Sequence, residues 1–261
     1  MKTLCYFLTA ALISAAGVAT AVPVIDGSIN PGEYALSLGT SDPATSNYGA
    51  YGLFSLVADQ DASNIYIGVR ATPEVNFNSL ILVVGNQNSL AGIPAGTQLP
   101  NGGGGGGLGN LDLTVGFEAD YVFRITTGNT NEAYVNALNY VGHTSGSAPQ
   151  EFLGGGPNTN AGTLISAPTG TYSGVQTAFR RSPGDYTTNT TEGWEIALPK
   201  ALLNAGNGNQ IRVAVLYGNS DTNNFSNQQI PAGTSTTTSG GGAVISAVGG
   251  SSMTMGWTMY E

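Results

Sequence analysis

Residues 51–70 read YGLFSLVADQDASNIYIGVR, and this stretch decides the fold class. Two apolar runs flank residues 59–63, whose Asp and Ser side chains favour a turn. In the second run Ile65, Ile67 and Val69 alternate with other residues, which is the period of a β-strand that buries one face. The stretch therefore predicts an antiparallel β-hairpin.

Strand signals recur along the rest of the chain. Residues 79–84 (SLILVV) form a continuous apolar run, which is typical of a central, fully buried strand. Other strands are expected at residues 111–117, 120–126, 133–140, 172–180, 193–198, 211–217, 243–248 and 253–260. About a dozen short strands separated by turn signals predict one all-β domain, a two-sheet antiparallel β-sandwich of the jelly-roll or immunoglobulin-like kind.

Three Gly- and Asn-rich segments are expected to be long loops, at residues 86–110, 142–160 and 221–242. The first contains six consecutive glycines, residues 102–107. Such a run has no preferred backbone conformation and must be either mobile or closely packed. Pro199 can open a single helical turn over residues 200–205, closed by Gly206, so one short helix is expected.

The first 21 residues have the features of a secretory signal peptide. A basic residue precedes the apolar run 3–18, which is too short to cross a bilayer. Residues 19–21 (ATA) place small side chains where signal peptidase cleaves. We expect cleavage after Ala21 and a mature domain of residues 22–261 outside the cell or at its surface. The one cysteine, Cys5, lies in the signal, so the mature chain has no disulfide and no thiolate metal site.

Charged residues are scarce and mostly acidic. The chain has 7 Lys and Arg against 16 Asp and Glu, a formal net charge of −9. Nucleic acids and anionic membrane surfaces attract clustered basic side chains, so neither is an expected partner. No stretch after the signal is apolar enough for membrane insertion. A hydrophobic content of 41% also argues against disorder.

Five segments occur in the order found in a group of secreted bacterial proteins. They are VIDGSINPGEY (24–34), ADQDASNIYIG (58–68), ADYVFRI (119–125), WEIALP (194–199) and FSNQQIP (225–231). Together they resemble the family 9 carbohydrate-binding modules and their DOMON-like relatives. The resemblance implies a two-sheet antiparallel sandwich. The proteins of this group bind sugars, bind haem or have no known ligand.

Sugar binding requires exposed, planar aromatic side chains on which sugar rings stack. In the family 9 modules this role falls largely to tryptophans. Here Trp194 and Trp257 alternate with apolar residues, which predicts that both lie in the core. The candidate ligand-binding residues are instead tyrosines in or beside loops: Tyr48, Tyr51, Tyr140, Tyr172 and Tyr186.

The predicted hairpin turn contains the one candidate metal site. Asp59, Asp61 and Asn64 lie within this turn and supply the hard oxygen ligands that calcium prefers. An Asx-rich turn has the same composition, and the spacing of a complete loop such as the EF-hand is missing. Calcium is therefore the one candidate cofactor, and an ordinary turn is the favoured interpretation.

The sequence contains few candidate catalytic residues and few candidate haem ligands. The only histidine is His143, which excludes most zinc sites and leaves little for a Ser-His-acid triad. The methionines within residues 253–259 could serve with it as haem ligands, but their spacing is that of strand packing. Glu118 and Asp120 would share one strand face as a carboxylate pair, for which a polar sandwich surface is the simpler explanation. We expect a protein that is not an enzyme.

Two functional hypotheses follow. The first is a non-catalytic extracellular module that binds a glycan or another cell-surface polymer. The second is a structural subunit that assembles with copies of itself into a fibre or surface layer through edge strands, with residues 22–25 and 253–260 as the pairing segments. Asn189 and Asn224 also match the N-glycosylation pattern.

Overall fold

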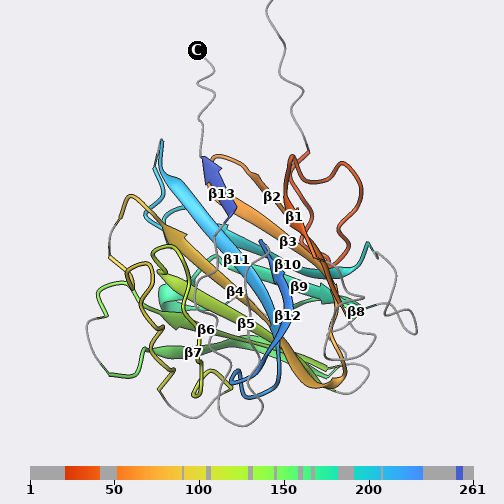
Figure 1. The fold of residues 1–261 in the computed structure, drawn as a ribbon. Helices are drawn as coiled ribbons and strands as arrows, with labels where there is room; N and C mark the ends of the chain where they lie inside the picture. Colours follow the sequence, from red (N-terminus) through yellow and green to blue (C-terminus); the bar gives the residue numbers. More distant parts are fainter. Residues whose placement is uncertain are drawn as a thin grey trace, which may run out of the picture.

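The computed structural model describes residues 21–41, 52–89, 91–103, 107–128, 132–143, 146–157, 161–165, 168–181, 191–206, 208–231 and 251–254. In this part of the chain the expected fold class is confirmed: two antiparallel sheets pack face to face as a β-sandwich (Figure 1). The proposed signal peptide, the predicted strand at residues 243–248 and Trp257 lie outside the described residues. None of the described helical residues forms a helix long and apolar enough to span a membrane.

The first sheet has six strands in the order β1-β2-β3-β10-β9-β8. Their bounds are Leu36–Thr40 (β1), Gly52–Gln60 (β2), Asn64–Thr72 (β3), Gly193–Pro199 (β10), Gln176–Arg180 (β9) and Ala161–Ile165 (β8). The predicted hairpin is β2–β3, in which Gln60 pairs with Ile65. The side chains of Ile65, Ile67 and Val69 are buried, as their alternation predicts.

The second sheet has the order β12-β11-β4-β5-β6-β7, and β13 also pairs with β11. Their bounds are Phe225–Ile230 (β12), Gln210–Gly218 (β11), Asn76–Asn86 (β4), Tyr121–Gly128 (β5), Glu132–Asn139 (β6), Gln150–Pro157 (β7) and Ser251–Thr254 (β13). β12 and β13 lie along the same side of β11 at its two ends, because Val215 pairs with Ile230 and Ile211 pairs with Met253.

The main hydrophobic core fills the space between the two sheets. Trp194 of β10 lies in it with 0% of its surface exposed, which confirms the prediction for this tryptophan. Its indole nitrogen donates a 2.7 Å hydrogen bond to the hydroxyl of Thr177 on β9. The Thr177 hydroxyl in turn donates to the carbonyl of Glu195 at 2.9 Å. The one polar atom of the indole is therefore satisfied in the core.

A second hydrophobic core lies on the outer face of the seven-stranded sheet. β4 supplies both cores, since Leu80, Leu82 and Val84 face the main core while Ile81 and Val83 face the second one. This double burial explains why residues 79–84 are apolar without alternation. The layer that covers the outer face, here called the cover segment, consists of the described residues between 91 and 119. Its buried side chains are Ile93, Leu99, Leu108, Leu111, Leu113, Val115, Phe117 and Ala119.

Backbone hydrogen bonds hold the cover segment together and connect it to the residues before β7. Leu99 N–H donates to the Leu113 carbonyl at 2.8 Å, and Gly103 N–H donates to the Ala148 carbonyl at 2.9 Å. The strand predicted at residues 111–117 is wrong: only isolated bridges form there, such as that between Gln98 and Thr114. The reason is that this segment packs across the face of a sheet and does not extend its edge.

Two strands lie inside segments that were expected to be loops. β7 falls within residues 142–160 and β12 within residues 221–242. Gly154, Gly155 and Gly156 weaken the strand signal of β7. The sequence FSNQQI of β12 looks polar, yet Gln228 and Gln229 are buried and Gln228 Oε1 accepts a 3.0 Å hydrogen bond from the Leu53 N–H. Tertiary contacts therefore decide both strands.

The short helix also lies elsewhere than predicted. A 3-10 helix, η2, spans Gly170–Tyr172. The predicted helical segment is a hydrogen-bonded turn in which Ala205 N–H donates to the Lys200 carbonyl at 2.8 Å. Asn204 within it has a φ of 47°, which is incompatible with a continuing right-handed helix.

We predict that the cover segment belongs to the folding unit. Phe117 is 1% exposed in the second core. Phe117→Ala should therefore lower the free energy of unfolding by about 3–5 kcal/mol, as buried aromatic truncations do. Phe152→Ala is the matched control, because that ring is 57% exposed and its removal should change stability little. Denaturant unfolding measures both, and equal stability of the two variants would contradict the prediction.

Candidate functional site

The tyrosines proposed from the sequence do not form one exposed surface. Tyr140 is 0% exposed, and its hydroxyl donates to the Pro100 carbonyl at 2.7 Å. Tyr172 is 2% exposed, and its ring packs edge-on against Tyr121 and Phe123. The expectation of exposed rings is corrected for these two, because the cover segment encloses the first and the main core the second. The other three, Tyr48, Tyr51 and Tyr186, lie outside the described residues.

The turn that was considered for calcium is closed by protein donors. Asp61 Oδ1 accepts from the N–H groups of Ser63 (2.6 Å) and Asn64 (2.7 Å), and Oδ2 accepts from the Tyr66 hydroxyl (2.6 Å). Burial raises the pKa of the Asp61 carboxyl, but these donors outweigh it and the net shift is downward. The Lys200 ammonium donates to the Asp61 carbonyl. This is the geometry of an Asx turn, and calcium would have to displace these bonds.

Asp59 faces away from this arrangement. Its Oδ1 accepts from the Gln60 N–H at 2.7 Å and its Oδ2 from the Ala35 N–H at 3.2 Å, so it ties β2 to the residue preceding β1. Throughout the described ranges, no three His, Cys, Asp or Glu side chains gather as a metal site. Of the haem candidates, His143 Nε2 contacts the Gly146 carbonyl at 3.1 Å within its own loop. Met253 lies on β13, and Met255 and Met259 lie outside the described residues.

The carboxyls of Glu118 and Asp120 lie together beside a small cavity. Asp120 is 1% exposed, and burial raises the pKa of its carboxyl to about 6, with a further contribution from the charge of Glu118. The Asp120 Oδ2 accepts from the Asn86 N–H at 2.7 Å, and Glu118 Oε1 accepts from the Gly92 N–H at 3.0 Å. The cavity has a volume of about 100 Å³, well below the roughly 300–1,000 Å³ of pockets for drug-sized ligands. It can hold only a small group.

A second buried carboxylate, Glu195, anchors the N-terminal segment to the centre of the six-stranded sheet. Its Oε2 accepts from the N–H groups of Asp26 (2.9 Å) and Gly27 (2.6 Å), and its Oε1 accepts from the Tyr34 hydroxyl (2.6 Å). Gly27 has a φ of 84°, and a Cβ there would lie 2.5 Å from the backbone nitrogen of Arg180. Burial raises the pKa of Glu195 to about 7 against the effect of these three donors. The contacts identify Glu195 as a structural anchor with its acceptors in use.

Two exposed aromatic side chains and a half-buried one gather on the part of the seven-stranded sheet that the cover segment leaves open. Alternation places Tyr134 and Asn136 of β6 on the outer face, since Ala133, Val135 and Ala137 between them enter the main core. Phe152 of β7 pairs with Asn136 and is 57% exposed. Tyr134 and Phe152 are therefore diagonal neighbours on adjacent strands, with Cα atoms about 7–8 Å apart.

Phe77 extends this row. It is 44% exposed and has a φ of 70°, an uncommon conformation for a bulky residue. A Cβ on Gly128 would lie 2.3 Å from Phe77 Cε1, so the ring rests directly on the backbone of β5. Gly128 pairs with Glu132, two residues before Tyr134, which makes the ring the next diagonal neighbour. Phe77, Tyr134 and Phe152 thus cross β5, β6 and β7 in a diagonal, here called the aromatic row.

Only the outward position of Tyr134 in the aromatic row could be predicted from the sequence. The alternation of residues 133–139 (AYVNALN) places Tyr134 and Asn136 opposite the apolar positions. Phe152 lies beside three glycines in a segment expected to be a loop, and Phe77 reaches the sheet face through an irregularity in the β4–β5 pairing between Asn76 and Ser79. Neither position follows from periodicity, so they emerge only from the strand pairing.

The comparisons with known proteins leave the family open. No protein-family model matches the chain, and no curated protein and no solved structure matches it either. The resemblance to family 9 carbohydrate-binding modules and DOMON-like proteins therefore stays a prediction. The fold and the aromatic row carry the functional argument.

The raised pKa values of Glu195 and Asp120 predict that the protein is more stable in mild acid. The pKa of Glu195 is raised from 4.5 to about 7, so the folded state binds this proton more tightly than the unfolded chain does. The stability linked to it is fully present below the unfolded value and is lost as the pH rises through about 7. Asp120, raised to about 6, acts in the same direction. The free energy of unfolding should therefore fall from about pH 5 to about pH 7.5.

Glu195→Gln should flatten this dependence while keeping an acceptor for the Asp26 and Gly27 N–H groups. Denaturant unfolding at several pH values measures the slope. Asp112→Asn is the control. The Asp112 carboxyl lies in the cover segment, where it accepts an exposed hydrogen bond from Gln98 Nε2 at 2.8 Å. This substitution should leave the slope unchanged. A slope unchanged by Glu195→Gln, or a wild-type protein whose stability rises with pH over this range, would refute the assignment.

Proposed function

We propose that this protein is a secreted, non-catalytic module that binds a glycan through the aromatic row. The observation that carries the proposal is the placement of Phe77, Tyr134 and Phe152 on an open sheet face. Sugar rings have an apolar side that stacks on planar aromatic groups, and their hydroxyls bond to polar side chains nearby. Asn136, which pairs with Phe152, supplies such an amide on the same face.

The chemistry of the exposed apolar side chains favours a glycan over a protein partner at this face. Within the part of the chain that the structure describes, Phe77 and Phe152 are the aromatic members of the exposed large hydrophobics. The aliphatic members in the described residues lie in other segments, and they are Val22, Val24, Leu36 and Val141. A protein interface mixes aromatic and aliphatic anchors around a dry centre. Rings separated by polar residues suit a chain of sugars.

The row is held rigidly, which lowers the entropy cost of binding. Tyr134 and Phe152 project from paired strands, and the ring of Phe77 lies against Gly128. The cover segment contacts the sheet beside the row at Gly107. A Cβ on Gly107 would lie 1.8 Å from the guanidinium of Arg124 on β5, and Arg124 pairs with Asn136 on β6. A glycine at this rim keeps side chains away from the neighbouring face.

Removing rings from the row should weaken glycan binding without unfolding the domain. We expect mature protein to bind at least one of a panel of polysaccharides, soluble ones in affinity electrophoresis and insoluble ones in pull-down assays. Phe152→Ala and Tyr134→Ala should each reduce affinity about tenfold, the equivalent of about 1.4 kcal/mol for one lost stacking contact.

Leu36→Ala is the matched control, since Leu36 is 39% exposed on β1 in the other sheet. It should bind as the wild type does. Binding to none of the polysaccharides, or equal binding by the Tyr134→Ala and Phe152→Ala double variant, would rule the proposal out.

A second candidate function is self-assembly into a fibre or surface layer. The observation in its favour is that Val22 and Val24 are 52% and 63% exposed, just before the Glu195 anchor at residues 26–27. An exposed apolar segment of this kind could add to the edge of a neighbour's sheet. Against it, the Val24 N–H already donates to Glu33 Oε1 at 3.0 Å, and its carbonyl accepts from the Asp26 N–H at 3.0 Å.

Self-assembly predicts that a mature protein shortened to begin at Ile25 stays monomeric while the full mature protein assembles. Higher salt should strengthen assembly by screening the net negative charge. Light scattering across concentration and salt measures both effects. A full-length mature protein that remains monomeric at every concentration would eliminate this function and leave the glycan-binding module alone.

A further inference from the structure

One member of the aromatic row, Tyr134, lies beside bare backbone. Its partner on β7 is Gly155, which has a φ of 130°. A Cβ on Gly155 would lie 2.2 Å from the Ala133 carbonyl oxygen, so this position has no room for a side chain. Glycines inside a strand often mark a place where a ligand approaches the backbone closely. A sugar ring that packs against Tyr134 therefore has space over Gly155.

Glu132 adjoins two members of the aromatic row. It lies two residues before Tyr134 on β6, so both side chains project from the outer face. It also pairs with Gly128, where a Cβ would lie 2.3 Å from Phe77 Cε1. Directly paired residues have Cβ atoms about 4.5–5.5 Å apart. The Glu132 side chain therefore begins next to the Phe77 ring, and its carboxylate shares the open face with Tyr134.

The carboxylate of Glu132 is available at this face, whereas the neighbouring cation is enclosed. Within the described residues, no hydrogen bond or ion pair engages the half-buried Glu132 side chain. Arg124 of β5 is only 5% exposed. Its Nε donates to the Ser79 hydroxyl at 2.9 Å, and its guanidinium also donates to the Ser220 carbonyl. A ligand on the aromatic row thus meets a carboxylate acceptor, while the positive charge beside it is used inside the protein.

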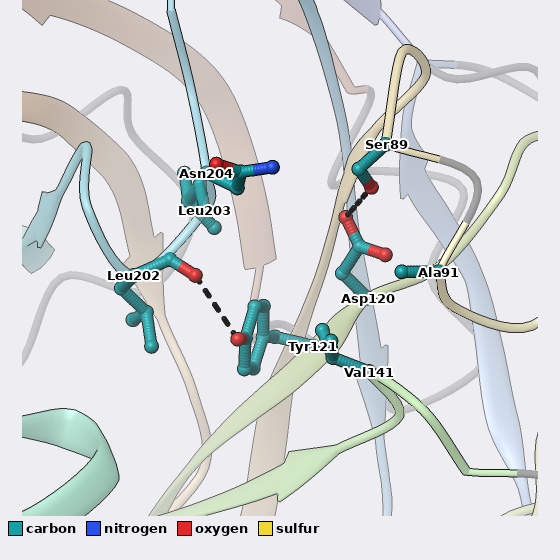
Figure 2. A pocket seen from close by; sticks show the side chains of 8 residues that line it. All are labelled: Ser89, Ala91, Asp120, Tyr121, Val141, Leu202, Leu203 and Asn204. Atoms are coloured by element: carbon teal, nitrogen blue, oxygen red, sulfur yellow. Dashed lines mark hydrogen bonds between the residues drawn. The ribbon is translucent and has the colours of Figure 1, made fainter.

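A carboxylate in this position discriminates between classes of sugar. Its two oxygens accept hydrogen bonds, and neighbouring hydroxyl groups of an uncharged sugar can donate to both of them. A uronic acid or a sulfated sugar would instead place a second anion against it, and like charges that face each other in a complex suppress binding. The small cavity shown in Figure 2 lies at the opposite ends of β5 and β6, where Tyr121 pairs with Asn139, and contributes no residue to this contact.

We propose that Glu132 determines which class of glycan the aromatic row accepts: uncharged sugars, whose hydroxyl groups donate to its carboxylate, in preference to uronic acids and sulfated sugars. The sugar lies against Tyr134 and over the bare backbone at Gly155. This inference rests on the proposed glycan-binding function and adds the substrate class and the residue that selects it.

The test compares polymers that share a backbone and differ in charge. One pair is hydroxyethylcellulose and carboxymethylcellulose, and the other is methyl-esterified and de-esterified homogalacturonan. Titration calorimetry with the mature protein at about 0.15 M sodium chloride screens the long-range field of the negative chain, because the Debye length is then about 8 Å. The wild type should bind the uncharged member of a pair about tenfold more tightly than the acidic member, or more.

Glu132→Gln keeps the shape of the side chain and removes its charge, so it should lower this ratio about tenfold and weaken binding of the uncharged polymer several-fold. Asp112→Asn is the matched control, because it removes the same charge from the cover segment, and it should leave the ratio unchanged.

Three outcomes would overturn the inference while glycan binding stands: equal or tighter binding of the acidic polymers, a ratio that Glu132→Gln leaves unchanged, or binding confined to polysaccharides outside both pairs. Equal effects of Glu132→Gln and Asp112→Asn would also overturn it, because the selection would then come from net charge. Absence of binding across the whole polysaccharide panel is the separate result that removes the proposed function itself.

Discussion

The central strands of the seven-stranded sheet are apolar on both faces, and this requires a separate layer on each side to exclude water. The six-stranded sheet covers one face, and the cover segment covers the other. On the strands the apolar part of the outer face consists of Ile81, Val83, Val122, Leu138, Ala214, Leu216 and Phe225, and the cover segment packs on it. Beyond it the outer face becomes polar and aromatic, with Asn136, Tyr134 and Phe152. Two-sided burial thus fixes the cover segment and, where it stops, leaves the open surface on which the proposed binding row lies.

The six-stranded sheet depends on a different contact, the buried Glu195. This side chain connects the centre of the sheet to residues 26–34, together with the Ser28–Glu192 bridge, the bond from the Gly193 N–H to the Gly27 carbonyl and the bonds from the Arg70 guanidinium to the Ile29 carbonyl. The Tyr34 ring lies over Gly68 on β3, where a Cβ would lie 3.1 Å from it, and Gly68 pairs with Glu195. The separate sequence segments IDG, EY and WEIALP are therefore parts of one hydrogen-bonded arrangement. Their order along the chain has a physical basis in this protein whatever its relatives are.

The sequence predicted those features that depend on local periodicity. The β2–β3 hairpin, the buried β4, the inward Trp194 and the sandwich class all follow from alternation or continuous apolar runs. The sequence did not predict the elements whose structure depends on which strand or sheet face they contact. β7 and β12 have compositions typical of loops and become strands only through pairing, while residues 111–117 look like a strand and pack across a sheet face. The candidate site shows the same division: a position in or beside a loop predicts an exposed tyrosine, yet Tyr140 and Tyr172 are enclosed by layers that the sequence does not reveal.

Phe77 is the member of the aromatic row that is hardest to explain by folding alone. A bulky residue at a φ of 70° costs about 1–3 kcal/mol, and an asparagine or glycine would adopt this conformation more easily. The surrounding contacts hold the strained segment in place: Asn78 Nδ2 donates to Glu74 Oε2 at 3.1 Å and lies 3.2 Å from the Tyr217 hydroxyl, and the Thr127 hydroxyl donates to the Glu74 carbonyl at 3.0 Å. These bonds would fix the backbone equally well around a glycine. What only phenylalanine supplies is the exposed ring over Gly128, so the retained strain favours a role for that ring at the surface.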